Sequence, residues 1–276
     1  METVLITGCS SGIGEATART FLKAGWTVYA TARDVDDLTD LADSGCETAE
    51  LDVTDVDQIG AVVDRIVEET GRIDCLVNNA GYAKYAPLED VPLAELHRQF
   101  DVNLYGPHRL MQAVLPHMRE REDGTIVNLS SVNGRITHPL GGAYSGSKYA
   151  LEAMSDALRA EVAGFGVDVV LIEPGPVDTA FDERADAEAV PEEKRTPAYG
   201  SLYRAFDDAS AVIGGGGGII AVGPEDVAAT VLDAASCTEP RPRYPVGTFA
   251  RFALLGRFLP DRIRDTAYRF AARVAG

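Results

Sequence analysis

Tyr144 and Lys148 stand four residues apart in the sequence YSGSK, so a helix would place both side chains on one face. A tyrosine phenol has an ordinary pKa of about 10 and is a poor acid or base at neutral pH. A lysine ammonium one helical turn away favours the phenolate and lowers the pKa of the phenol. A tyrosine tuned in this way can exchange a proton with a carbinol oxygen. The pair therefore predicts acid–base chemistry, although a YxxxK pattern alone is common by chance.

Ser131 lies thirteen residues before Tyr144 and directly follows an apolar run that is typical of a strand. A hydroxyl group at the end of that strand could hold a substrate oxygen beside the tyrosine. Ser130 is adjacent and competes for the same role.

The sequence TGCSSGIG at 7–14 follows the first apolar run and opens a helical pattern. Its spacing is not the G-x-G-x-x-G of the dinucleotide fingerprint, but the physics is shared. Gly8 permits a tight turn, Gly12 lets backbone amides approach a pyrophosphate, and Gly14 lets the helix pack on the strand. The N–H groups at the start of the helix favour a phosphate. The other candidate cofactor residues in this loop are Ser10, Ser11 and Ile13.

Two further positions bear on the cofactor. Ala32 occupies the place where an acidic residue would bind a ribose 2′-hydroxyl, and the next residue, Arg33, could pair with a 2′-phosphate. This favours NADP over NAD, whereas Asp34 and the absence of a basic residue in the glycine loop argue against it. Asp52, beside Val53 at the end of the third predicted strand, could accept a bond from an adenine amino group; the alternative is a solvated strand-end carboxylate.

Short apolar runs alternate with helical patterns along most of the chain. The runs at 4–7, 27–31, 48–52, 75–78, 125–130 and 167–173 are typical of strands covered on both faces. Helical patterns lie near 13–24, 35–43, 55–70, 92–119 and 144–163. This alternation predicts a parallel sheet with right-handed crossovers. The sequence at 242–246 could add an edge strand, where its prolines are tolerated.

The C-terminal third has a different composition. Residues 179–223 hold a charged stretch and the run Gly214 to Gly218, which cannot continue a helix. We expect a mobile insertion over the carboxyl edge of the sheet, or an ordinary surface loop, and then a helix over 224–235. The tail at 241–276 carries eight arginines and two acidic residues. Its apolar side chains fall near helical spacing and are interrupted by Pro260; they are Phe252, Leu255, Leu259, Ile263 and Phe270.

These patterns predict one domain over 1–276. Its parts are a cofactor-binding and catalytic core at 1–178, a substrate-loop region at 179–240 and a basic amphipathic tail at 241–276. We expect the tail to pack on the domain or on a second subunit. A membrane-surface role is the alternative.

Composition excludes several classes of protein. Hydrophobic residues make up 46% and charged residues 25% of 276, as in an ordinary soluble globular protein. No uncharged apolar stretch is long enough to span a membrane, and the start METVLITG lacks the basic region of a signal peptide. Four scattered cysteines and four histidines form no metal-ligand spacing, so we expect no metal and a reducing cytoplasm.

The formal net charge is −18, and only four residues are lysines. No basic footprint dominates, which argues against a nucleic-acid partner. An acidic, lysine-poor surface is typical of proteins from halophiles, where dense counterions screen the repulsion. The alternative is an ordinary acidic protein.

Several motifs occur together in one order and spacing. They are TGCSSGIG, NNAG (78–81), DVNLYG (101–106), SS (130–131), YSGSK (144–148) and PGPVDT (174–179). Jointly they resemble the single-domain branch of the short-chain dehydrogenase/reductase family, well over residues 1–180 and loosely over 181–240. PGPVDT and the RYPVG sequence are similar to 17-beta-hydroxysteroid-dehydrogenase-like and retinol-dehydrogenase-like members.

The resemblance implies a three-layer, doubly wound parallel sheet of the Rossmann type, in the order 3-2-1-4-5-6-7, with the cofactor at the topological switch point. It implies reversible hydride transfer between a nicotinamide and a carbonyl or secondary alcohol, and Arg33 favours NADP over NAD as the cofactor. It also implies a homodimer or homotetramer, associated through the helices at 92–119 and 144–163.

The resemblance further implies a catalytic tetrad. Tyr144 would be the general acid/base, and Lys148 would also hold the nicotinamide ribose hydroxyls. Ser131 would orient the substrate oxygen, and Asn103 would hold a water that links Lys148 to solvent. Pro107 lies four residues after Asn103 and has no N–H group, which would leave the Asn103 carbonyl free to accept from that water.

The remaining motifs imply cofactor contacts. The NNAG sequence would stabilise the central strand and line the adenosine side, and the PGPVDT sequence would close the nicotinamide pocket, with a bond from Thr179 to the carboxamide. The residues concerned are Asn79, Ala80, Gly81, Pro174, Gly175, Val177 and Thr179.

Three other functions compete with this one. A sugar-nucleotide epimerase or dehydratase on the same fold usually has a different glycine spacing and a longer chain. A non-catalytic dinucleotide sensor would not need Tyr144. A membrane-associated lipid or retinoid dehydrogenase would use the tail at 241–276. The apolar tail favours a bulky, hydrophobic substrate.

Overall fold

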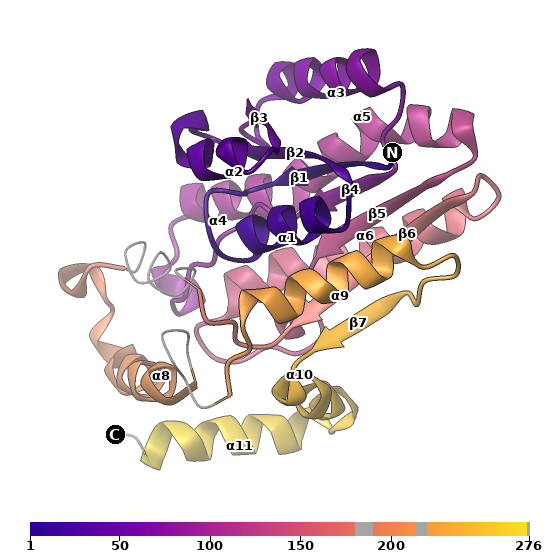
Figure 1. The fold of residues 1–276 in the computed structure, drawn as a ribbon. Coiled ribbons are helices and arrows are strands. Elements are labelled where there is room, and N and C mark those ends of the chain that lie inside the picture. The colour runs from indigo at the N-terminus through magenta and orange to yellow at the C-terminus, as the bar shows by residue number, and fades with distance from the viewer. Residues whose placement is uncertain (180–189, 214–219, 275–276) are drawn as a thin grey trace.

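The computed structural model describes residues 1–179, 190–213 and 220–274, which surround a seven-stranded parallel sheet (Figure 1). The strands lie in the order β3-β2-β1-β4-β5-β6-β7, which confirms the predicted doubly wound sheet. Their bounds are β1 Thr3–Thr7, β2 Thr27–Ala32, β3 Glu47–Glu50, β4 Cys75–Asn78, β5 Gly124–Leu129, β6 Val167–Pro174 and β7 Arg243–Val246. All six pairings are parallel, so the carboxyl ends of the strands share one edge.

Helices cover both faces of the sheet. Val4 and Ile6 of β1 point into the core beneath α1, α2 and α9, whereas Leu5 points into the core beneath α3, α5 and α6. The bounds are α1 Gly12–Lys23, α2 Thr39–Asp43, α3 Val56–Thr70, α5 Gly106–Arg121, α6 Gly142–Val162 and α9 Pro224–Ser236. Burial on both faces explains why the central strands are continuously apolar.

The helix predicted over 92–119 is wrong as a single element. It divides into α4 Leu93–Phe100, a π-helical segment Asp101–Tyr105 and α5. The physical reason is Pro107, which has no N–H group for an i→i−4 bond. The Gly106 N–H instead donates to the Asp101 carbonyl, five residues back. A π segment of this kind is frequent at functional sites.

Other short elements connect the layers. They are the 3₁₀ turns Val35–Leu38, Leu88–Asp90, Val132–Gly134, Glu192–Lys194 and Pro197–Tyr199. The predicted helix at 35–43 is therefore a 3₁₀ turn followed by α2. The region at 179–240 contains a helix that the pattern did not predict, α8 Gly200–Ile213, whereas the Gly214 to Gly218 run lies outside the described residues.

The chain ends in α10 Thr248–Ala253, a 3₁₀ turn Leu254–Phe258 and α11 Asp261–Val274. The break at Pro260 and the edge position of β7 are both confirmed. Figure 1 shows α11 alongside α8, below the β7 edge of the sheet. Within the described ranges, no helix combines the length and apolarity needed to cross a bilayer.

Candidate active site

The glycine loop joins the carboxyl end of β1 to α1. Gly8 and Gly12 have φ values of +73° and +61°, in the region that favours glycine. A Cβ atom on Gly14 would lie 2.1 Å from the Gly8 carbonyl oxygen, so only glycine lets α1 begin this close to β1. The half-buried residues of the same loop are Ser10, Ser11 and Ile13. The first N–H groups of α1 therefore stand at the carboxyl edge of the sheet, where an anion can bind.

The NNAG sequence at the end of β4 holds this loop in place. The Asn79 side-chain amide donates to the Thr7 and Gly8 carbonyls at 2.8 and 3.0 Å. The backbone N–H groups of Asn79 and Ala80 both donate to Thr7 Oγ1 at 3.1 Å. Gly81 follows at the same edge. These bonds join the ends of β1 and β4, the pair beside which the strand order reverses.

The segment after β6 returns to the glycine loop. Pro174 ends the strand, and the Gly175 N–H donates to a carbonyl of β7 at 3.2 Å. Val177 forms an isolated parallel bridge with the segment before α9. A Cβ atom on Gly12 would lie 3.2 Å from Thr179 Cβ, so these two residues nearly touch. The structure thus brings together the first and last motifs of the predicted cofactor site.

The other end of the predicted cofactor site is formed by β2 and β3, whose ends share a backbone hydrogen bond of 2.8 Å. Arg33 is exposed there and makes no side-chain hydrogen bond or ion pair with the described residues. One Asp52 carboxylate oxygen accepts from the Thr54 N–H and hydroxyl at 2.8 and 2.7 Å. Val53 is buried beside them. Arg33 directly follows β2, and Asp52 lies two residues after the end of β3.

Tyr144 and Lys148 lie one turn apart on α6, and both are buried. Lys148 Nζ is 5.9 Å from the centre of the Tyr144 ring and donates to the Leu129 carbonyl at 2.7 Å. Burial lowers the pKa of Lys148 to about 8, and the nearby Glu152 carboxylate opposes that shift. The ammonium form therefore still predominates at pH 7. The structure holds a cation beside the phenol ring at the end of β5.

Asn103 is fully buried in the π segment, and both polar atoms of its side chain make hydrogen bonds. Its Oδ1 accepts from the Tyr82 N–H at 3.1 Å, and its Nδ2 donates to the Tyr82 carbonyl at 2.9 Å and to Ser147 Oγ at 3.1 Å. Ser147 in turn donates to the Tyr144 carbonyl at 2.8 Å. Asn103 therefore couples the π segment to the backbone of the turn that carries the tyrosine.

The two competing serines have different surroundings. Ser131 Oγ accepts from the Asn133 N–H at 3.1 Å and caps a 3₁₀ turn that packs against α6. Ser130 Oγ is buried beside Gly134 and Glu152 and has no hydrogen-bond partner among the described atoms. Because Ser130 faces the protein interior, Ser131 is the better candidate for contact with a substrate.

An aromatic cluster adjoins Tyr144 and has no counterpart in the predicted site. The Tyr85 ring lies 5.9 Å from the Tyr144 ring, 5.9 Å from His138 and 5.0 Å from Phe206, between ring centres. Burial lowers the pKa of His138, which favours its neutral form. These residues come from three distant segments, so no local pattern could have revealed the cluster. It places apolar surface beside the tyrosine.

A buried ionic cluster lies on the other side of Lys148. Arg243 contacts Glu152 at 2.9 Å and Glu173 at 3.3 Å, and Arg135 contacts Glu173 at 3.2 Å. Burial raises the pKa of Glu173, and the Glu152 carboxylate adds to that effect. In the sequence, the four-residue spacing of Lys148 and Glu152 on one predicted helix was the one pattern that could have indicated this cluster. In the part of the chain that the structure describes, no group of three or more His, Cys, Asp or Glu side chains could hold a metal ion.

Comparison with protein families and curated proteins identifies relatives of the chain. The family model for short chain dehydrogenase matches residues 2–189. An uncharacterized oxidoreductase of Escherichia coli, YbbO, is 36% identical over 269 residues, which cover 96% of this chain and 93% of the relative. An NADPH-dependent 3-dehydrocapnine reductase of Ornithobacterium rhinotracheale is 34% identical and covers 97% and 96%. A 3-ketodihydrosphingosine reductase of Bacteroides thetaiotaomicron is 37% identical and covers 66% of each chain.

Solved structures agree with these relatives. A short-chain dehydrogenase from Streptomyces avermitilis superposes with a TM-score of 0.81 at 33% identity, over 100% of this chain and 98% of that one. A short-chain dehydrogenase/reductase from Burkholderia phymatum, in complex with NAD, gives 0.78 at 26% identity over 96% and 95%. An alcohol dehydrogenase from Thermococcus sibiricus, complexed with 5-hydroxy-NADP, gives 0.72 at 25% identity over 91% and 97%.

The close packing at Gly14 generates a prediction with a matched control. Gly14→Ala should lower the free energy of unfolding by about 2–3 kcal/mol, because the new Cβ would overlap the Gly8 carbonyl. Gly60→Ala, in α3, has no atom within 4 Å of the added Cβ and should raise stability by about 0.5–1 kcal/mol. Urea unfolding measures both values. Equal stability of the two variants would contradict this account of the loop.

Proposed function

Because the chain belongs to the short-chain dehydrogenase family, and so transfers a hydride between a nicotinamide cofactor and a carbonyl or secondary alcohol, we propose that Tyr144 is its general acid/base. Lys148, Ser131 and Asn103 complete the proposed catalytic group. The observation that carries this proposal is the buried Lys148 ammonium held beside the Tyr144 ring at the end of β5.

The residues present fit a bound dinucleotide. Gly8, Gly12 and Gly14 let the backbone pack closely at the start of α1, and the helix directs its first N–H groups toward the carboxyl edge of the sheet. Thr179 and the NNAG sequence border the same edge. The nicotinamide supplies or accepts the hydride when it is bound there.

The protein's own contribution is to position the substrate and move a proton. In reduction, Tyr144 Oη gives its proton to the carbonyl oxygen as negative charge develops, and Ser131 donates a hydrogen bond to that oxygen. The Lys148 ammonium stabilises the phenolate that remains. Asn103 fixes the π segment against the tyrosine's turn, and a water at the Asn103 carbonyl returns the proton from solvent.

The proposed cofactor preference is for NADP over NAD. Arg33 is exposed at the end of β2 and has no competing ion pair among the described residues, so its guanidinium group is available to a 2′-phosphate. The Ornithobacterium relative is NADPH-dependent, whereas the Burkholderia structure holds NAD, so the relatives alone leave both cofactors open. In this proposal Asp52 contacts the adenine amino group with its second oxygen.

The proposed substrate is a bulky, apolar ketone or the corresponding alcohol. Tyr85, His138 and Phe206 place an aromatic wall beside Tyr144. Two relatives are reductases named for a 3-dehydro and a 3-keto compound. An apolar wall next to the acid/base group suits a carbonyl that is attached to a long hydrocarbon chain.

We also propose that the chain acts in the cytoplasm as a homodimer or homotetramer, through α4, α5 and α6, and that its acidic surface is adapted to high salt. Light scattering of the purified protein tests the oligomeric state, and cell fractionation tests the location. Thermal unfolding in rising KCl tests the salt adaptation, because screening should relieve the repulsion among the excess acidic charges.

Tyr144→Phe should lower kcat by about 10²–10⁴-fold with any carbonyl substrate, because it removes the hydroxyl that carries the proton. Tyr149→Phe on the same helix is the control: Tyr149 is exposed and its variant should keep wild-type turnover. NADPH oxidation followed at 340 nm measures both. Near-unchanged turnover in Tyr144→Phe, with unchanged folding, would favour a dinucleotide sensor over an enzyme.

Arg33→Ala should raise KM for NADPH by about 10–100-fold and leave KM for NADH nearly unchanged, since a charge-assisted hydrogen bond contributes about 1.5–3 kcal/mol. Lys23→Ala removes an equal charge at the C-terminal end of α1, the end away from the glycine loop, and should change neither KM. Steady-state kinetics with both cofactors decide the matter. An equal loss for NADPH and NADH would contradict the 2′-phosphate role.

Phe206→Ala should lower kcat/KM for long-chain 3-keto substrates by roughly tenfold and for short ones much less, because it removes apolar contact surface. Phe165→Ala, at an exposed position after α6, serves as the control. A series of ketones of increasing chain length supplies the comparison. If the loss does not depend on chain length, the aromatic cluster does not bind the hydrocarbon chain.

A further inference from the structure

The segment after β7 exposes an unusual amount of apolar surface. Five large side chains within twelve residues are about half to three-quarters exposed: Phe252 at 69%, Leu255 at 59%, Phe258 at 71%, Leu259 at 47% and Ile263 at 53%. Other exposed large apolar residues are dispersed along the chain. In the single chain these five side chains therefore face solvent, whereas other residues of the segment contact the domain. We call them the apolar surface of the tail.

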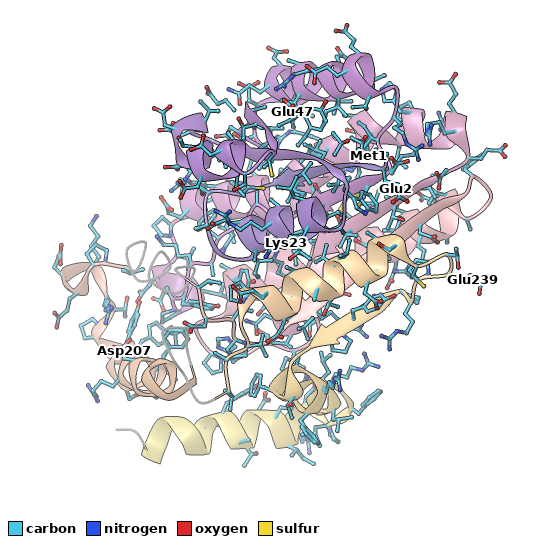
Figure 2. All side chains as sticks on the ribbon, in the orientation of Figure 1. Met1, Glu2, Lys23, Glu47, Asp207 and Glu239 are labelled. Carbon is cyan, nitrogen blue, oxygen red and sulfur yellow. The ribbon has the colours of Figure 1, made fainter. Side chains whose placement is uncertain are left out.

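The segment is nevertheless attached firmly to the domain. Ala250 and Leu254 are buried and pack with Val132, beside the strand end that carries the catalytic serine. The Tyr268 hydroxyl of α11 donates to the Thr137 carbonyl at 2.5 Å. Figure 2 shows side chains of α10 and of the turn after it extending outward from the ribbon. The segment after β7 is thus docked on the domain by one side, and its other side faces solvent.

The same surface is positively charged. Arg251, Arg257 and Arg262 are exposed, and the Arg257 guanidinium lies 4.5 Å from the centre of the Phe258 ring. Residues 247–276, after β7, contain six arginines and two acidic residues, in a protein whose formal net charge is −18. Basic and apolar groups are therefore concentrated together on a chain that is otherwise strongly acidic.

A second copy of the chain is a poor occupant of this surface. A two-fold contact would place each patch against its own equivalent, and so would bring the exposed arginines of both copies together. A contact with the acidic remainder of another copy would satisfy the arginines, but it would leave Phe252 and Phe258 against charged side chains. An anionic bilayer offers negative headgroups and hydrocarbon at the depths that Arg and Phe require.

We propose that the apolar surface of the tail binds the surface of an anionic phospholipid membrane, with Phe252, Leu255 and Phe258 inserted between headgroups and Arg257 and Arg262 at the phosphates. At physiological ionic strength the Debye length is about 8 Å, so the acidic remainder is largely screened from the bilayer while the arginines touch it. The protein binds as a peripheral protein and needs no spanning helix.

This placement brings the membrane near the aromatic cluster. Thr137, which holds Tyr268, directly precedes His138 of the aromatic cluster. Helix α8, which carries Phe206, contacts α11. An apolar substrate could therefore pass from the bilayer to the aromatic cluster without crossing bulk water. That last step rests on the proposed substrate class, whereas membrane binding itself does not.

The test is flotation of the full-length protein with vesicles of phosphatidylcholine alone or with 30% phosphatidylglycerol, in 0.15 M and 2 M KCl. We expect binding to the anionic vesicles at 0.15 M and at least tenfold weaker binding to neutral ones, and the preference should shrink in 2 M KCl. Failure to bind anionic vesicles, or equal binding to both, would overturn the proposal. The assay needs no turnover, so its failure is distinguishable from failure of the enzymatic function.

Two double variants separate the contributions. Phe252→Ser with Phe258→Ser, and Arg257→Glu with Arg262→Glu, should each reduce vesicle binding by at least tenfold. Val56→Ser with Phe165→Ser changes exposed apolar residues elsewhere and should bind like wild type. Circular dichroism confirms folding, and light scattering reports the mass. If the phenylalanine variant alters the oligomeric mass and leaves vesicle binding unchanged, the surface is a subunit interface and the proposal is wrong.

Discussion

Lys148 is a cation inside the protein, and the geometry of the site follows from the need to hold it there. Removing an ammonium group from water is costly unless other groups replace the lost hydration. The Leu129 carbonyl at the end of β5 supplies one hydrogen bond, and Glu152 supplies opposite charge from the next turn of α6. Glu152 is itself buried and is balanced by Arg243, which also contacts Glu173. The ionic cluster therefore supports a charge that the proposed proton transfer needs close to Tyr144.

The second constraint is the closeness of the backbone at the carboxyl edge of the sheet. Parallel strands place all their carboxyl ends together, and a dinucleotide can reach that edge only if side chains stay out of its way. Gly8 and Gly14 let the loop, α1 and the end of β4 approach one another closely, Gly12 leaves room for Thr179, and Asn79 then ties the loop to the adjacent strand. Beside Tyr144, the π segment lets the Asn103 side chain reach the turn that carries the tyrosine. The proposed cofactor contacts and the proposed proton transfer thus depend on the same sheet edge.

The sequence predicted the features whose residues are neighbours along the chain. The Tyr144–Lys148 spacing, the glycine loop and the apolar strand runs each carry a local physical signature, and all three appear where predicted. Local reasoning was inadequate where contacts join distant segments. The aromatic cluster joins Tyr85 and Phe206, more than a hundred residues apart, and α8 lies in a region whose composition predicted only a loop. The break in the helix at Pro107 had a local signal, but helical periodicity on both sides obscured it.

The core and the tail of the chain differ in net charge and in the exposure of their apolar side chains. The core that matches the family buries its apolar residues on both faces of the sheet and presents an acidic exterior to water. The tail reverses both features, since it exposes phenylalanine and leucine among arginines, while Ala250, Leu254 and the Tyr268 hydroxyl attach it to the core. The arginines after β7 concentrate positive potential on one apolar surface, and that combination suits a partner that is itself both negative and hydrocarbon-rich.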